Sequence, residues 1–318
     1  MSRPFGAARE NAPFGVLVIV VTGFLVAFGD ALVKYVNADF SVWQLFVLRA
    51  LLAVPLLIGM LYLGRGAAGI RTNAPGWIAL RSSFLMMMWL AFYAALPSLS
   101  LPVIAAAYYS GPLFMVLLSA LLTGETVGSR RWIAVLVGFA GVLVVLRPGA
   151  DAFSPLTLLP ILAGFFYALT AIVTRTRCAD ESPLMLSLGL NVGFLAVGIV
   201  ASLVVAVWDP PAALAAANPF LLGPWAALGL RQAGIVVLLA FIIVVTGVGV
   251  AKAYQCGPPA VIGTFDYTYL GSAAFWSFLM FGVLPDRMTI LGMVLIAGAG
   301  MLAIWPPRAA PAVAPRTS

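Results

Sequence analysis

Three charged side chains lie inside stretches that are otherwise apolar, and they are the first candidates for function. In "FGDALVKYV", Asp30 and Lys34 are one helical turn apart, and Arg49 follows within "WQLFVLRALLAVPLL". A charge at the centre of a bilayer costs roughly 2.5–3.5 kcal/mol even on the lenient insertion scale. We therefore expect these groups to face a polar solute, to carry a proton or to pair with one another.

The composition excludes most other chemistry. Of the 318 residues, 63% are hydrophobic and 8% are charged, whereas soluble proteins have about 25% charged residues. Histidine is absent, and Cys178 and Cys256 form no CxxC pair. HExxH and GxSxG motifs are missing as well, so we expect neither an enzyme nor a bound metal or cofactor. The sequence predicts an all-α integral membrane protein.

Ten stretches are long and apolar enough to span a bilayer, which takes about 20 residues each. They cover residues 13–36, 42–62, 77–98, 101–122, 131–147, 155–175, 184–208, 232–255, 259–282 and 288–305. The first run exceeds the 7–15 apolar residues of a secretory signal, so we expect it to be retained. Short tails, 1–12 and 306–318, flank the spans.

The basic residues predict an orientation rather than a nucleic-acid surface, although the net charge is +7. With cytoplasmic termini, ten of the 17 Lys and Arg residues fall in inner loops and tails, three fall outside and four lie within spans. Such asymmetry follows the positive-inside rule. We expect both termini in the cytoplasm of a bacterial-type cell.

Two halves of the chain share weak similarities in a preserved order. "GFLVAFGDALVKY" in the first span aligns with "GFFYALTAIVTRT" in the sixth, and Tyr109 in the fourth aligns with Tyr267 in the ninth. Residues 13–147 and 155–305 then form two five-helix repeats. Because five is odd, the second repeat is inverted, an arrangement characteristic of secondary transporters.

On these residues the chain resembles the EamA-type proteins of the drug/metabolite transporter superfamily. The resemblance rests on the five-plus-five layout, on "LTGETVGSRRWIAVLVGFAGVLVVLRPG" and on "AKAYQCGPPAVIGTFDYTYL". Where many relatives have a second acidic turn residue, this chain has Val283, with Asp286 three residues later. The resemblance implies a basket of ten helices that moves small organic solutes by alternating access, without ATP hydrolysis.

Charges at intermediate depth are the first set of candidate cavity residues. Asp30 and Arg49 lie about 10 Å inside the outer ends of their spans. Asp266 and Lys252 are their counterparts in the other half. In the alternative interpretation, Asp30 pairs with Arg49 or Lys34 and never meets a solute, while Lys252, Arg81 and Lys34 extend to the interface.

Mid-span aromatic residues are the second set. Trp89 and Tyr93 are four residues apart on one helical face. Tyr109 and Tyr267 occupy matching repeat positions, and each buried hydroxyl needs a polar partner. The candidate site therefore comprises Asp30, Arg49, Trp89, Tyr93, Tyr109, Lys252, Asp266 and Tyr267.

Together these features predict a multi-pass transporter of the inner membrane. Its expected solute is small and polar, amino-acid-like or otherwise zwitterionic or anionic, and protons are a candidate coupling ion through Asp30 and Asp266. Ring-bearing metabolites such as riboflavin or S-adenosylmethionine are the first alternative, and a non-transporting membrane protein is the second. The chain is expected to act as a monomer or homodimer in the lipid bilayer, without nucleic acid.

Overall fold

The computed structural model describes residues 12–66, 71–111, 113–114, 117–118, 121, 129–146, 155–178, 180–256 and 265–304. The regular structure of these residues is entirely helical. Glu125 and the expected tails, apart from Ala12, lie outside the described residues. The prediction of an all-helical fold is confirmed for this part of the chain.

The helices follow the expected spans closely, with bounds shifted by a few residues at most places. They are α1 (Ala12–Val36), α2 (Val42–Arg65), α3 (Pro75–Ala95), α4 (Leu101–Tyr108), α6 (Ser129–Leu146), α7 (Leu158–Arg177), α8 (Pro183–Trp208), α11 (Leu230–Cys256), α13 (Thr268–Phe281) and α14 (Arg287–Ile304). Six of them, α1, α2, α3, α7, α8 and α11, are long and apolar enough to cross a membrane, and α6 and α14 are shorter apolar helices. The chain is thus a multi-pass membrane protein.

The fourth and ninth expected spans differ from the prediction, because each contains a turn. The helix α4 ends at Tyr108, and a turn follows at Tyr109 and Ser110. In the ninth span, a turn at Tyr267 separates residues 265–266 from the helix α13. The aligned tyrosines therefore both lie where a helix is interrupted.

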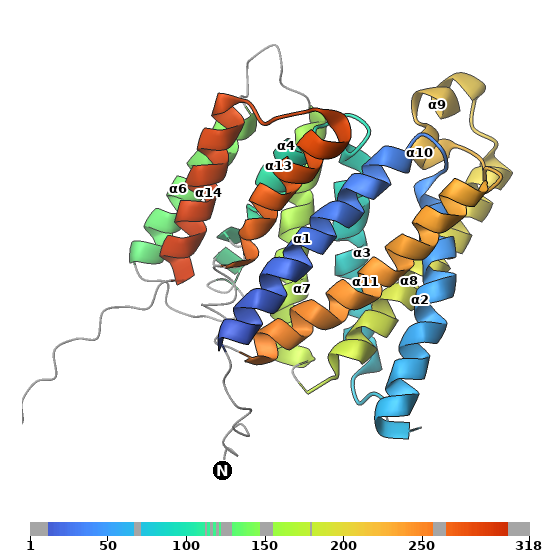
Figure 1. Ribbon diagram of the computed structural model, residues 1–318, viewed down its shortest axis with the longest axis horizontal. Helices are drawn as coiled ribbons and strands as arrows, with labels where there is room; N and C mark the ends of the chain where they lie inside the picture. Colours follow the sequence, from blue (N-terminus) through green and yellow to red (C-terminus); the bar gives the residue numbers. More distant parts are fainter. Residues whose placement is uncertain are drawn as a thin grey trace, which may run out of the picture.

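Antiparallel and parallel neighbours both build the bundle (Figure 1), with α1 antiparallel to α11 and parallel to α13. The pair α6 and α14 packs together at one edge, and α2 packs against α8 at the other. Between them, α1 packs against α11 and α13, and α3 packs against α7. One large cluster of buried residues, with members from α1, α2, α3, α4 and α13, fills the centre.

Serine caps begin two of these helices. The side chains of Ser41 and Ser182 accept hydrogen bonds from the backbone N–H groups of Gln44 (3.4 Å) and Met185 (3.1 Å). Such caps satisfy backbone donors that have no partner within the helix. The starts of α2 and α8 are thereby fixed at opposite ends of an antiparallel pair.

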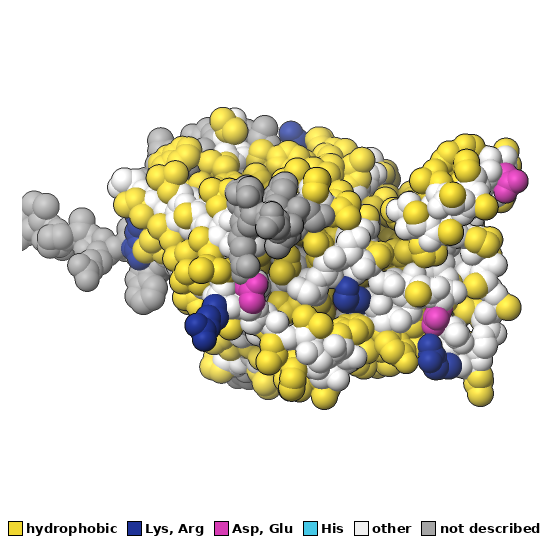
Figure 2. Space-filling view, turned by 90° about the horizontal axis from the view of Figure 1, so that it is seen from above, with side chains coloured by type: hydrophobic (Ala, Val, Ile, Leu, Met, Phe, Trp, Pro, Cys, Tyr) yellow, Lys and Arg dark blue, Asp and Glu magenta, His cyan; other side chains and the backbone are white. Residues whose placement is uncertain are grey.

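The long loop between α8 and α11 contains two short helices, α9 (Ala212–Ala217) and α10 (Pro219–Leu222). It is fastened to the start of α2, because Trp43 Nε1 donates to Leu221 O at 2.7 Å and Gln44 Nε2 donates to Ala226 O at 2.8 Å. Figure 2 shows this end of the bundle, where hydrophobic side chains predominate and charged ones are few and scattered.

Candidate functional site

A small internal cavity brings together four of the eight candidate residues. Asp30 of α1, Arg49 of α2, and Trp89 and Tyr93 of α3 line it, and Thr246 and its neighbours on α11 close it. Its volume is about 30 Å³. That space admits a water molecule but not a metabolite. The cavity is therefore narrow, and its walls carry one carboxyl group and one guanidinium.

Arg49 is the most unusual group in this cavity. Its side chain is 2% exposed, and its guanidinium carbon lies 4.9 Å from the Phe194 ring centroid and 5.5 Å from that of Phe46. Its recorded hydrogen bond is a long one, 3.4 Å from Nη1 to the Tyr93 hydroxyl. The Nε and Nη2 atoms are buried and have no partner among the described residues. A guanidinium has five donors and suits a bidentate carboxylate, so this geometry leaves donors available for an anionic group.

Asp30 is equally buried but has a direct partner. Its Oδ2 accepts a 2.6 Å hydrogen bond from the Tyr269 hydroxyl, on α13. It is 2% exposed. Because α1 contributes Asp30 and α13 contributes Tyr269, this bond joins the two halves of the chain beside the cavity.

The ion pair of the alternative interpretation does not form in the described part of the chain. Asp30 lies within 4 Å of neither the Arg49 guanidinium nor the Lys34 ammonium, whereas an ion pair between Arg231 and Asp39 does meet that distance. The Arg49 guanidinium packs instead against the rings of Phe46 and Phe194. The Asp30 carboxyl group accepts a hydrogen bond from the Tyr269 hydroxyl. The cavity thus keeps its two charges separate.

A tyrosine stack adjoins this site and includes two further candidates. The Tyr109 ring lies 5.1 Å from that of Tyr267 and 5.6 Å from that of Tyr269, between ring centroids. The Tyr109 hydroxyl donates to the backbone oxygen of Asp266 at 2.9 Å, whereas the buried Tyr267 hydroxyl has no partner in the part of the chain that the structure describes. The aligned tyrosines of the two halves therefore touch, and Tyr269 connects them to Asp30.

The other cations of the spans are placed differently. Lys34 Nζ donates to the backbone oxygens of Leu96 and, at 2.6 Å, Leu99. Arg81 Nε donates to Thr174 Oγ1 at 3.0 Å, and its Nη1 donates to Leu186 O at 3.3 Å. Lys34 therefore ties α1 to the turn after α3, and Arg81 ties α3 to α7 and α8.

Lys252 and Asp266 do not line the cavity. Lys252, near the end of α11, has an exposed side chain, in line with the interface alternative. Asp266 is half-buried and contacts Tyr109 through its backbone. Sequence reasoning had left Tyr269 and Thr246 out of the site. Tyr269 comes two residues after Tyr267, where the structure has a turn. In a continuous helix, Tyr267 and Tyr269 would point to different sides.

Known proteins that resemble this chain are membrane transporters. Residues 13–147 match the EamA-like transporter family. A riboflavin transporter of Vibrio cholerae is 25% identical over 296 residues, which covers 92% of this chain and 93% of the relative. An S-adenosylmethionine uptake transporter of Rickettsia prowazekii is 24% identical and covers 87% of both chains. The pseudopaline exporter CntI of Pseudomonas aeruginosa is 23% identical over 90% of this chain and 94% of its own.

The fold is also shared with a protein of known crystal structure. The two superpose with a TM-score of 0.62 at 16% identity, over 93% of this chain and 98% of the other. The relatives named above are transporters rather than enzymes and are matched over nearly their whole length. Residues 13–147 therefore match the EamA-like transporter family, and the chain as a whole is similar to bacterial transporters of small metabolites.

Proposed function

We propose that this protein is a secondary transporter that moves a small polar organic metabolite across the inner membrane by alternating access. The observation that carries the proposal is Arg49, a buried guanidinium with two nitrogens that find no partner among the described residues, in a narrow cavity that also holds Asp30. Intramembrane charges of this kind usually mark a solute pathway.

The proposed architecture is ten helices in two inverted repeats, residues 13–147 and 155–305, with tails 1–12 and 306–318. The packing supports it. Exchanging each helix with its counterpart turns the α1–α11 contact into α7–α3, the α1–α13 contact into α7–α4, and α3–α8 into α11–α2. The contacts α2–α8, α4–α13 and α6–α14 map onto themselves. An axis of twofold pseudosymmetry in the membrane plane would produce this pattern.

Two aligned glycines support the same architecture. A Cβ on Gly164 would lie 2.6 Å from Tyr108 O, so α7 approaches the interrupted fourth span closely. A Cβ on Gly23 would lie 3.8 Å from the backbone nitrogen of Tyr269, beside the interruption in the ninth span. Interrupted helices at the junction of two repeats are where transporters of this type place their substrate sites.

We infer that the solute carries a carboxylate or another anionic group. Arg49 would bind that group through its free donors, and Asp30 would bind an ammonium group of a zwitterion. A metabolite needs more than about 30 Å³. Under this proposal, the cavity widens toward one side of the membrane at a time to admit the solute.

A ring-bearing metabolite is the second candidate solute. Trp89 lines the cavity 5.0 Å from the Tyr93 ring, and the tyrosine stack of Tyr109, Tyr267 and Tyr269 adjoins it. Flat rings stack on such side chains. Relatives named as riboflavin and S-adenosylmethionine transporters favour this candidate.

The distribution of basic residues supports an orientation with both termini in the cytoplasm. Asp30 faces the cavity and is the proposed proton carrier if transport is proton-coupled. Under this proposal, an imposed pH gradient drives solute accumulation, and the Asp30→Asn variant exchanges solute without responding to the gradient.

The test is flux into proteoliposomes that contain the purified protein alone. Amino acids, riboflavin, S-adenosylmethionine and nucleosides are offered separately to the wild type and to Arg49→Gln. Saturable flux of one class that is lost in Arg49→Gln supports both the transporter and the site. Flux that Arg49→Gln retains would keep the transporter and remove Arg49 from the site. Absence of flux for every class would favour the non-transporting alternative.

A further inference from the structure

Glu181 makes a contact between two distant parts of the chain at one end of the bundle. It lies in the turn between α7 and α8, directly before the Ser182 cap. Its Oε1 accepts hydrogen bonds from Thr72 Oγ1 (2.7 Å), Asn73 N (3.0 Å) and Ala74 N (3.1 Å). Ala74 begins α3 and has no capping side chain of its own. A carboxylate from the other half of the chain thus satisfies the free donors at this helix start.

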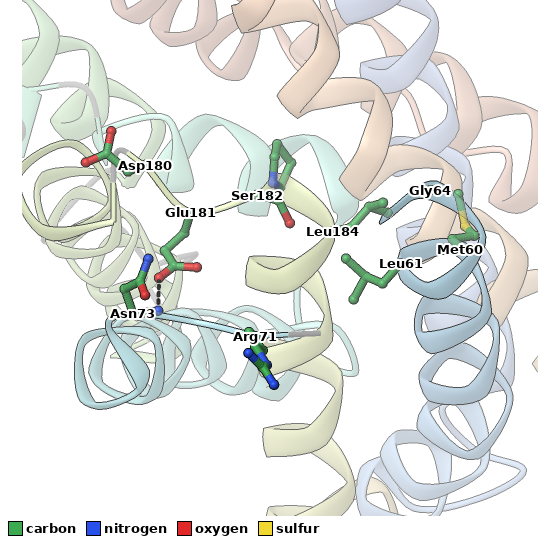
Figure 3. A pocket seen from close by; sticks show the side chains of 10 residues that line it. Met60, Leu61, Gly64, Arg71, Asn73, Asp180, Glu181, Ser182 and Leu184 are labelled. Carbon is green, nitrogen blue, oxygen red and sulfur yellow. Dashed lines mark hydrogen bonds between the residues drawn. The ribbon is translucent and has the colours of Figure 1, made fainter. Parts of the chain in front are cut away.

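Beside Glu181, a wide cavity opens at the same end of the bundle (Figure 3). It has a volume of about 440 Å³ and lies between the end of α2 and the start of α8. In Figure 3, Leu61 and Met60 face Ser182 and Leu184 across it, and Glu181 is bonded to Asn73 at its rim. This volume falls in the range of small-molecule pockets. It is large enough to admit the kind of solute that the Asp30–Arg49 cavity excludes.

Asp39 makes the corresponding contact at the opposite end. It lies between α1 and α2, two residues before the Ser41 cap, and its Oδ2 is 3.0 Å from Nη2 of Arg231. Arg231 is the second residue of α11, and its Nη1 donates to the Tyr35 hydroxyl at 3.3 Å. The helix α2 has 24 residues, about 36 Å, and separates this contact from the one at Glu181.

The two contacts are related by the exchange of the two halves. In each, an acid in the turn after the first helix of one half binds the start of the third helix of the other half. Each joins the ends of a packed pair, α1 with α11 or α7 with α3. Those pairs include three of the helices that line the Asp30–Arg49 cavity. Separating a pair at its joined end is therefore the direct way to open that cavity to one side.

We propose that the Glu181 contact and the Asp39–Arg231 contact are the two gates of the transport cycle, opened alternately, and that the cavity beside Glu181 is the vestibule behind the first gate. This inference rests on the proposed function. Both contacts are formed in the structure, and the central cavity is too narrow for a metabolite. The Asp39–Arg231 pair is partly exposed, with side chains 30% and 58% accessible, so water competes for it and it breaks readily.

A native cysteine reports on the gate at Glu181. Cys178 is 2% exposed and packs in a cluster with Leu61 and Ile78, so opening that gate would uncover it. Burial also raises the pKa of its thiol, which keeps it unreactive while the gate is closed. A Cys256→Ser background leaves Cys178 as the single thiol.

The experiment measures maleimide labelling of Cys178 in liposomes at a fixed pH. We expect Glu181→Gln to raise the labelling rate about 5- to 10-fold, and Asp180→Asn, which changes a neighbouring acid of the same cavity, to leave it unchanged. Thr72→Val, a milder change, should raise it less. If Glu181→Gln labels no faster than the wild type, the contact is not a gate.

The decisive comparison adds a second substitution, far from Cys178, to the Glu181→Gln protein. All the proteins compared then have the same charge near Cys178. Asp39→Asn releases the opposite gate, so the state that is open at that end becomes populated at the expense of the state in which Cys178 is uncovered. The labelling rate should therefore fall about twofold or more. Asp209→Asn, an exposed acid at the same end, should have no effect. An unchanged rate with Asp39→Asn would mean that the contacts cap their helices independently. Labelling needs no solute, so this result stands apart from any failure to find flux.

Discussion

Three cations in the membrane-spanning helices, Lys34, Arg81 and Arg49, differ in how many of their hydrogen-bond donors have a partner. The Lys34 ammonium donates to carbonyl oxygens in the turn after α3, and the Arg81 guanidinium donates to a hydroxyl oxygen of α7 and a carbonyl oxygen of α8. Arg49 is more deeply buried, yet two of its nitrogens have no partner. A buried charge whose donors are used stabilises a helix contact, whereas one with unused donors is costly unless a ligand completes it. The comparison separates structural charges from a binding charge.

Removing Arg49 is expected to have the largest effect on transport. Loss of a buried charge that binds an opposite charge typically costs about 2–5 kcal/mol, so Arg49→Gln should lower kcat/KM for flux about 100-fold or more. The melting temperature should fall little, because Nε and Nη2 have no partner among the described residues and the hydrogen bond from Nη1 to Tyr93 is long. Flux and thermal unfolding of the same preparation check both points.

Asp30 should come next in its effect on transport. Asp30→Asn keeps the size of the side chain and removes the charge that faces the cavity, and we expect a 10- to 100-fold loss of flux, or about 1.4–2.8 kcal/mol. Initial rates at saturating and limiting solute distinguish a loss of binding from a loss of turnover. Wild-type rates in both regimes would remove Asp30 from the site.

Arg81→Gln should show the reverse pattern. Two hydrogen bonds that tie α3 to α7 and α8 are lost, so the free energy of unfolding should fall by about 1–3 kcal/mol. Flux per folded molecule should stay within about twofold of the wild type. Equilibrium unfolding in a detergent–denaturant series measures the first quantity. A variant with full stability but no flux would contradict the structural role given to Arg81.

Two neighbouring tyrosines offer a smaller contrast. Tyr269→Phe removes the hydrogen bond to Asp30 and should cost about 1–2 kcal/mol of unfolding free energy. Tyr267→Phe removes a buried hydroxyl without a partner and should be neutral or slightly stabilising. Thermal unfolding of the two variants side by side tests this, and equal losses would contradict the assignment of partners.

Lys252→Gln is the matched cation control, with the smallest effect. Because the side chain is exposed and lies apart from the cavity, stability should change by less than about 0.5 kcal/mol and flux by less than about twofold. A large loss of flux would show that Lys252 enters the pathway in another state of the cycle.

The sequence predicted much of the fold and four of the ten residues that line the central cavity. Long apolar runs between glycine- and proline-rich turns set the helices, because a spanning helix depends on length and hydropathy. The similar depths of Asp30 and Arg49, and the four-residue spacing of Trp89 and Tyr93, place these four residues where the cavity forms. Depth along a helix follows directly from the distance to its end.

Partners that come from distant helices were beyond sequence reasoning. Lys34 binds carbonyl oxygens more than 60 residues away, and Arg81 contacts α7 and α8, so neither contact has a local pattern. The turn at Tyr267 lacks glycine and proline within "FDYTYL", and the continuous helix expected there gave no reason to choose Tyr269. Packing between distant helices sets these positions, rather than the preference of the local residues for a helix or a turn.

The most direct test of the central claim is ligand-dependent thermal unfolding of the wild type, Arg49→Gln and Arg81→Gln. A ligand that binds the folded state raises its stability by mass action. Our account predicts that a carboxylate-bearing solute raises the melting temperature of the wild type and of Arg81→Gln, and leaves that of Arg49→Gln unchanged. An equal rise in Arg49→Gln would contradict it, because the solute would then bind without the guanidinium.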